Sequence, residues 1–230
     1  TTQETVSPPT LSSSFARLET LSGDGFTGAK FGLFQVIEGK DIYSLRGQNL
    51  TLNAKLRVVN SGGGGPLNTI KMVILEWTGT EDVTTHPIAT WGTTGAGIGS
   101  YSAGWAAKNT PANLGVSTSW NTYSITTSST ISAAATNIAV FIWNDDKAYG
   151  YNNKLEIGEV FLEEGTLAST FSSPPYEVEL QRCQRYLQVL TGKSAIGSAA
   201  STDAVTFLYN APVTMLKVPT QKYTNIPGVS

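Results

Sequence analysis

The chain of 230 residues is long enough for one large domain with a smaller appendix, and its single cysteine excludes an internal disulfide. Only 14% of the residues are charged, against roughly 25% in an average soluble protein, and this deficit favours strands, whose solvent faces accept Ser and Thr, over helices. The net charge of −2 argues against nucleic acid as a partner, and no apolar run approaches the roughly 18 residues of a membrane-spanning helix, so no membrane insertion is expected.

Strand patterns follow one another along most of the chain. The clearest is LTLNAKLRV (50–58), where apolar and polar residues alternate as in a strand with one face in water. The turn SGGGGP (61–66) separates it from a partner strand at 69–77. Further strands are expected, in chain order, at 15–21, 31–37, 120–126, 137–144 and 154–162. The stretch 78–119 has no sustained periodicity, so it either hides short strands or has a function.

Strands joined by Gly and Ser turns, with no helix between them, predict an all-β fold. We expect an antiparallel two-sheet β-sandwich over residues 1–171, with a jelly roll as the leading version.

A change of composition marks the end of this domain. Residues 172–192 are predicted to form a Ser/Pro linker and an amphipathic helix, whose apolar stripe consists of Leu180, Cys183, Leu187 and Leu190. On this stripe, Cys183 is expected to pack as a small hydrophobe. Strand patterns at 204–209 and 211–218 make residues 193–230 a second small β unit, which we expect to be incomplete.

Three segments together resemble a known family. They are VIEGKDIYSLRGQNLTLNAKLR (36–57), TSWNTYSIT (118–126) and LEIGEVFLEEGTLASTFSSPPYEVELQRCQRY (155–186). They resemble the carbohydrate-binding-module-like jelly roll of phage and prophage tail-fibre and virion-surface proteins, which is followed by a helix close to CQRYY. PVTMLKVPT (212–220) is similar to a later family pattern. Leu187 replaces the second family aromatic, and residues 78–117 match nothing in the family.

The resemblance implies a non-catalytic structural protein of the virion, a tail fibre or a head fibre. It implies assembly in the bacterial cytoplasm, display on the virion surface, a homotrimer and contacts with other virion proteins, but no particular ligand. The expected role of the jelly roll is to bind host surface glycans or to be displayed toward them. Two alternatives remain open: a purely architectural decoration or connector protein, and a polysaccharide depolymerase.

Aromatic residues in irregular segments are the ligand candidates. Exposed Trp and Tyr rings offer flat apolar faces on which sugar rings stack. The candidates are Trp91, Tyr101 and Trp105 in the Gly/Thr-rich stretch, and Tyr149 and Tyr151 beside an acidic loop. The alternative is that these rings anchor loops or trimer contacts.

Metal binding and catalysis have weaker signals. The loop WNDDKAYGYNN (143–153) is rich in oxygen ligands, so Asp145 and Asp146 are candidates for a calcium site, although the regular spacing of a calcium loop is absent. The alternative is a plain hairpin turn, and no other cofactor is expected. The single histidine, His86, is expected on a surface loop. Since no positioned acid and base are evident, we expect no enzymatic activity.

Overall fold

The computed structural model describes residues 2–4, 8–9, 11–12, 14–20, 30–60, 65–93, 95–146, 150–188, 196–201, 204–208 and 212–215. The chain divides into two compact units, residues 1–173 and residues 174–230. The division falls inside the Ser/Pro segment in which the sequence places the linker. Each unit is described by itself below.

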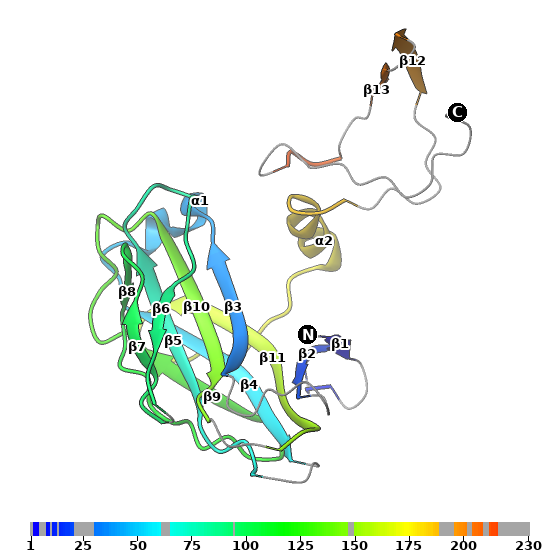
Figure 1. The fold of residues 1–230 in the computed structure, drawn as a ribbon. Helices are drawn as coiled ribbons and strands as arrows, with labels where there is room; N and C mark the ends of the chain where they lie inside the picture. Colours follow the sequence, from blue (N-terminus) through cyan, green and yellow to red (C-terminus); the bar gives the residue numbers. More distant parts are fainter. Residues whose placement is uncertain are drawn as a thin grey trace. The chain divides into compact units, whose positions relative to one another are not determined.

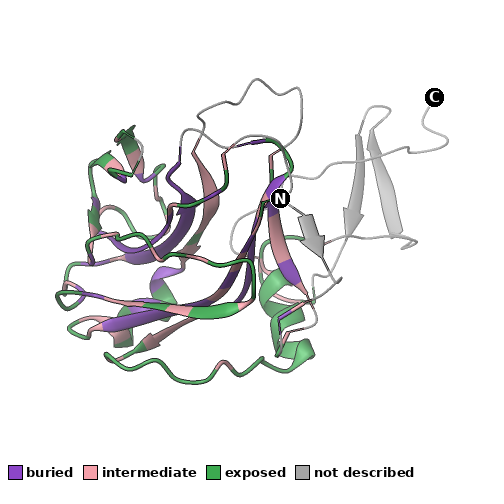
Figure 2. Ribbon diagram, turned by 90° about the horizontal axis from the view of Figure 1, so that it is seen from below, coloured by how far each residue is buried: buried purple, intermediate pink, exposed green. Residues whose placement is uncertain are grey.

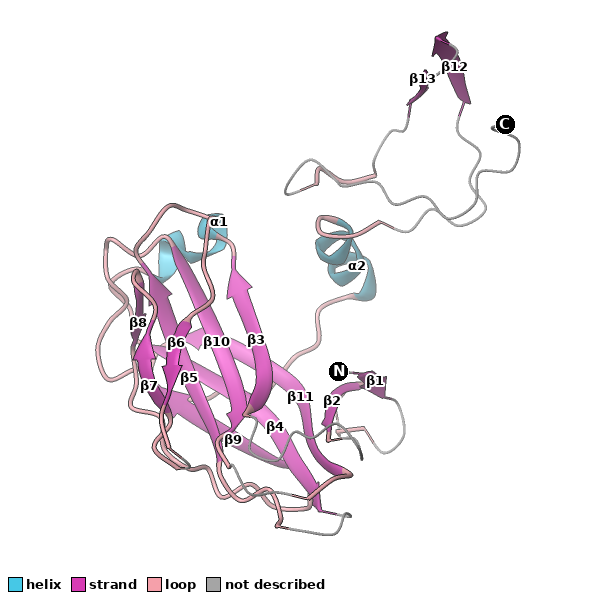
Figure 3. Ribbon diagram, in the orientation of Figure 1, coloured by secondary structure: helices cyan, strands magenta, loops and turns pink. Residues whose placement is uncertain are grey.

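The described part of the first unit contains two large antiparallel sheets and one two-stranded sheet, the hairpin β6–β7 (Figure 1). The five-stranded sheet has the order β1-β2-β11-β4-β9, with bounds Thr2–Glu4, Phe15–Glu19, Asn153–Glu164, Leu50–Asn60 and Asn121–Thr126. The four-stranded sheet has the order β3-β10-β5-β8, with bounds Phe31–Ile37, Asn137–Asn144, Ile70–Trp77 and Trp105–Ala107. Helix α1 (Gly39–Ile42) and a 3-10 turn (Tyr43–Leu45) follow β3 (Figure 3). The predicted antiparallel jelly-roll sandwich is confirmed.

The main core lies between the two sheets. Alternate residues of β4 point into it, as the sequence pattern predicts, and meet alternate residues of β5 and β10. Fully buried members include Leu52, Leu56, Met72, Ile74, Ile138 and Ile142. Figure 2 shows that buried residues concentrate on the strands.

A second core covers the outer face of the four-stranded sheet. The other residues of β5 and β10 form it, together with Trp105 from β8. Hairpin strands β6 (Ile88–Trp91) and β7 (Ile98–Tyr101) pack Ile88, Ile98 and Tyr101 against it. The stretch 78–119 therefore contains three short strands. Gly104 has φ +92° and its missing Cβ would meet the Trp77 ring, so this close turn requires glycine.

The outer face of the five-stranded sheet is charged instead. Glu156 of β11 is fully buried between its cross-strand neighbours Arg17 on β2 and Arg57 on β4. The guanidinium of Arg57 lies 4.8 Å from the Trp120 ring centroid. The side chains of both arginines keep nearly a fifth of their surface in solvent, at 19% and 18%.

The second unit contains helix α2 (Tyr176–Gln184) and the hairpin β12 (Ile196–Ser201) and β13 (Ala204–Leu208). Helix α2 begins directly after Pro175, which fits the preference for proline at a helix start. Its residues are not buried, and Cys183 is exposed, so the predicted packing of this cysteine is wrong for the single chain. Residues 212–215 are not a strand, contrary to the prediction for 211–218, and Pro212 lacks the N–H that a ladder needs.

Candidate functional site

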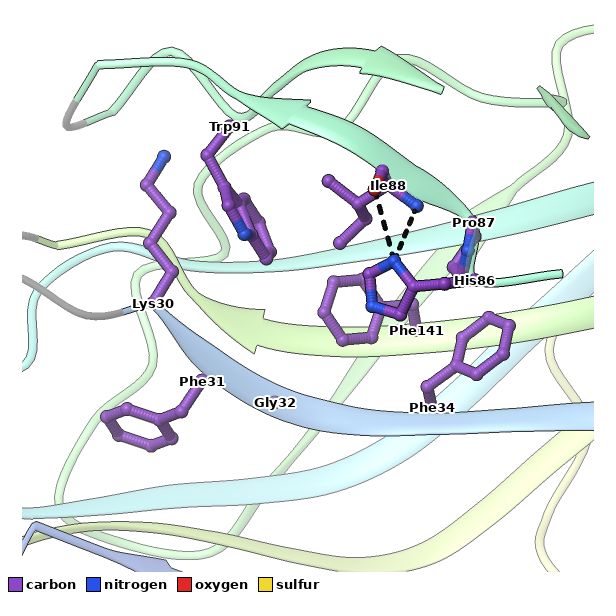
Figure 4. Close-up of a pocket in the computed structure, with 9 residues that line it drawn as sticks. All are labelled: Lys30, Phe31, Gly32, Phe34, His86, Pro87, Ile88, Trp91 and Phe141. Atoms are coloured by element: carbon purple, nitrogen blue, oxygen red, sulfur yellow. Dashed lines mark hydrogen bonds between the residues drawn. The ribbon is translucent and has the colours of Figure 1, made fainter. Parts of the chain in front are cut away.

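A groove of about 320 Å³ lies between β3 and β6, on the outer face of the four-stranded sheet (Figure 4). Three segments that lie far apart in the sequence line it. The lining residues are Lys30, Phe31, Gly32 and Phe34 at the start of β3, His86, Pro87, Ile88 and Trp91 at β6, and Phe141 on β10.

The floor of the groove follows from strand alternation. Phe31 packs toward the main core, so Phe34, three positions along β3, faces the opposite side together with Phe141 of β10. The two rings meet edge to face at 6.1 Å. Gly32 also lines the groove, and a Cβ there would collide with the Ile142 carbonyl and the Phe141 ring. The floor is therefore aromatic, and this position accepts only glycine.

Trp91, the last residue of β6, forms a wall. The residue keeps 39% of its surface exposed. The ring centroid lies 6.1 Å from that of Phe141, and Lys30 Nζ lies 5.3 Å from the indole. Trp91 thus presents a flat apolar surface beside an aromatic floor.

A buried lysine holds the chain beyond Trp91. Lys30 Nζ donates to the carbonyl oxygens of Gly92, Thr93 and Gly97 at 3.1, 3.2 and 3.1 Å. It also forms an ion pair with Asp145, and its side chain is only 2% exposed. Lys30 therefore fastens the tip of the β6–β7 hairpin to the sheet.

Asp145 connects a second lysine to the same tip. Its carboxylate lies 3.2 Å from Lys71 Nζ and accepts a 2.7 Å bond from Gly97 N, while Lys71 donates to the Gly95 carbonyl. Burial raises the pKa of Asp145, but the bonds from Lys30, Gly97 and Lys71 outweigh it, so the pKa lies below its ordinary value. The carboxylate is charged at neutral pH.

His86 stands at the other end of the groove on a fixed segment of backbone. The Thr85 carbonyl accepts a 2.9 Å bond from the Trp105 indole, and the Pro87 carbonyl accepts one of 2.9 Å from Ser102 N. His86 Nδ1 lies 3.1 Å from the Ile88 oxygen and 3.3 Å from its nitrogen. These contacts fix the orientation of the exposed imidazole.

Of the predicted ligand aromatics that the structure describes, only Trp91 lines the groove. Trp105 is 6% exposed and packs against Trp77 at 5.2 Å, so its assignment as a ligand residue is wrong. Tyr101 is half-buried in the second core, where burial raises its pKa to about 12. Tyr151 is 52% exposed and does not line the groove. Tyr149 lies outside the described residues.

The predicted calcium ligands do not form one site. Asp145 is occupied by two ammonium groups, whereas Asp146 accepts bonds from the backbone nitrogens of Asn68 and Thr69 at 2.7 and 2.8 Å. Within the described part of the chain, no group of three or more His, Cys, Asp or Glu residues could hold a metal ion. A calcium ion therefore does not fit these residues, because two lysine charges already occupy the first carboxylate.

Sequence reasoning missed Lys30, Phe34, His86 and Phe141 as groove residues. The alternation of 31–37 carried a signal for Phe34, since it places Phe31 and Phe34 on opposite faces. No local signal pointed to Lys30, whose partner Asp145 lies 115 residues away.

No protein-family model and no curated protein sequence matches the chain. Solved structures that are similar to this one, at low identity, include the following three. The bacteriophage CBA120 tailspike protein 4 enzymatically active domain shares 13% identity with a TM-score of 0.40, over 71% of this chain but 17% of that chain. A family 16 carbohydrate-binding module-2 shares 13% identity with a TM-score of 0.36, over 66% of this chain and 78% of that chain.

The third is the tripod from the baseplate of bacteriophage Tuc2009. It shares 9% identity with a TM-score of 0.32, over 69% of this chain and 49% of that chain. Identities and TM-scores this low carry no inference about the function of the chain. Separately, no helix of the described residues is both long enough and apolar enough to cross a membrane.

Proposed function

We propose that the chain is a non-catalytic structural protein of a phage virion surface, a tail fibre or a head fibre, whose sandwich binds host surface glycans in the groove between β3 and β6. The virion assignment depends on the sequence resemblance, above all that of residues 155–186. The glycan assignment depends on the groove.

The observation that carries the glycan proposal is the position of Trp91. The residue is 39% exposed at the wall of a groove whose floor is aromatic. A sugar ring has an apolar C–H face that stacks on such a surface, while its hydroxyls bond to polar groups at the edge. The 320 Å³ of the groove is within the range of about 300–1,000 Å³ that is typical of ligand pockets.

The titratable residues of the groove favour binding over catalysis. They are Lys30, whose ammonium is committed to backbone carbonyls and Asp145, and His86. Hydrolysis of a glycosidic bond uses two carboxyl groups that flank the bond. The groove lining supplies aromatic surface and one imidazole instead.

The homotrimer and the contacts with other virion proteins are part of the proposal. The hairpin β12–β13 is a two-stranded sheet, and such a sheet is marginal in water without further packing. Strands from other copies of the chain would complete it. Light scattering of the purified protein measures its mass in solution: a trimer supports this part of the proposal, and a monomer contradicts it.

A glycan array tests the binding function. The parent is compared with Trp91→Ala and with a matched control, Tyr151→Ala, which removes an exposed aromatic ring outside the groove. Loss of stacking should weaken binding by Trp91→Ala at least tenfold, or about 1.4 kcal/mol, whereas the control should match the parent. Equal binding by all three proteins contradicts the groove assignment.

Two other results distinguish the alternative functions. A parent protein that binds no glycan on the array indicates a purely architectural virion component. Release of reducing ends from host polysaccharide indicates a depolymerase. Either result contradicts the proposed function.

A further inference from the structure

The only lysine that lines the groove, within the described residues, has no donor left for a ligand. An ammonium group has three N–H donors. Lys30 Nζ has four acceptors within bonding distance, namely three carbonyl oxygens and the Asp145 carboxylate. With 2% of its side chain exposed, it cannot turn outward without breaking these bonds. Among the described residues that line the groove, a negatively charged ligand would therefore find no free lysine or arginine to bind directly.

The electrostatic field of the buried charges does not replace a direct contact between a cation and an anionic ligand. Lys30, Lys71 and Asp145 together carry one net positive charge. Four carbonyl oxygens point at the two ammonium groups, from Gly92, Thr93, Gly95 and Gly97, and their dipoles offset part of that charge. An anionic group that enters an aromatic groove loses its own hydration, and a charge without a direct partner is not compensated for that loss.

His86 supplies a second polar contact in the same groove. Its Nδ1 is occupied by the Ile88 backbone, and its Nε2 has no protein partner among the residues that the structure describes. Because the neighbouring carbonyls of Thr85 and Pro87 are both bonded, the imidazole is held in place before a ligand arrives. Preorganised groups of this kind bind at a lower entropic cost than mobile ones.

We infer that the groove takes neutral sugars in preference to acidic ones, with the ring stacked on Trp91 and a hydroxyl bonded to His86 Nε2. This inference rests on the proposed glycan binding and adds a class of ligand and a second contact residue.

Matched pairs of sugars test the preference for neutral ligands. Oligosaccharides that end in a hexose are compared with those that end in the corresponding hexuronic acid, which differs only in a carboxylate at C6. Binding is measured by calorimetry at pH 8. The neutral member of each pair should bind at least tenfold more tightly, and equal or tighter binding of the acids overturns the preference.

Two substitutions test the role of His86 separately. His86→Gln places an amide nitrogen near the position of Nε2, whereas His86→Asn places an oxygen near the position of Nδ1 and leaves the Nε2 position empty. We expect His86→Asn to bind the neutral sugar roughly five- to tenfold more weakly, the size of one hydrogen bond, and His86→Gln to stay within threefold of the parent. Because His86 is exposed, both variants should fold, which near-ultraviolet circular dichroism verifies.

The outcomes separate this inference from the function on which it rests. If Trp91→Ala abolishes binding but His86→Asn binds like the parent, the groove is a glycan site and the role of His86 is wrong. If the parent binds no sugar of either class, or Trp91→Ala has no effect, the proposed function fails and the inference fails with it.

Discussion

The two outer faces of the sandwich carry the same motif in different surroundings. On the four-stranded sheet, the fully buried carboxylate of Asp145 lies between Lys30 and Lys71, whose side chains are 2% and 6% exposed. On the five-stranded sheet, the fully buried Glu156 lies between Arg17 and Arg57, which are 19% and 18% exposed. The β6–β7 hairpin shields the lysines of the first set from solvent, whereas the arginines of the second set remain partly exposed to solvent. Covering one face thus creates a second core, a groove and a dry ion cluster.

The strands show why the β6–β7 hairpin covers the outer face of the four-stranded sheet. β5 and β10 are buried along their whole length, so both of their faces need cover. β4 alternates at its outer end, where Lys55 and Arg57 point away from the main core. The hairpin packs on the apolar outer face of β5 and β10. The polar outer face of β4 offers no comparable apolar surface.

Of the substitutions considered, Trp105→Ala should lower the free energy of unfolding the most. The side chain is 6% exposed, packs against Trp77 and Phe34, and donates to the Thr85 carbonyl. Its removal leaves a large cavity in the second core, and we expect a loss of about 4–5 kcal/mol in the free energy of unfolding, measured with urea. Trp91→Ala, at the exposed wall, is the control and should cost about 1 kcal/mol. Equal losses of unfolding free energy in the two variants would mean that packing in the second core does not stabilise the protein.

Asp145→Asn should have the next largest effect. The asparagine turns an N–H donor toward a lysine or Gly97 N, and it leaves two nearly inaccessible ammonium groups without a counter-charge. We expect a loss of about 3 kcal/mol, because breaking a buried ion pair leaves an uncompensated charge. The matched variant Glu156→Gln should lose about 1.5 kcal/mol, since water reaches both arginines. A larger loss for Glu156→Gln would contradict the role assigned to the hairpin cover.

The sequence predicted the parts of this structure that depend on local pattern. The predicted strands 120–126, 137–144 and 154–162 lie within one or two residues of β9, β10 and β11. The antiparallel sandwich followed from the same alternation. The groove did not, because its walls come from three distant segments and its lysine is bound through non-local contacts. The Gly-rich sequence around Trp105 led to the prediction that this residue is exposed. In the structure, Gly104 allows the chain to turn closely over Trp77, and Trp105 is buried.

A smaller effect is expected in the pH dependence of stability, through the carboxylate of Asp145. The pKa of Asp145 is lower in the folded protein than its ordinary value, although burial alone would raise it, because the bonds from Lys30, Gly97 and Lys71 favour the charged form. A group with a lowered folded-state pKa stabilises the protein above its unfolded pKa, about 3.9 for Asp. That contribution declines below this pH and is lost as the pH falls through the folded-state pKa.

The measurement compares the urea midpoints of the parent and Asp145→Asn at pH 7, 5, 4 and 3. Contributions of the other carboxylates are common to both proteins and cancel to a first approximation, provided that they do not interact with Asp145. The difference in urea midpoint between the parent and Asp145→Asn should be largest at pH 7 and 5 and should become smaller at pH 4 and 3. A gap that stays constant or widens on acidification would mean that the lysine-bound carboxylate has no lowered pKa. In that case the ion cluster would not be what fastens the hairpin over the sheet.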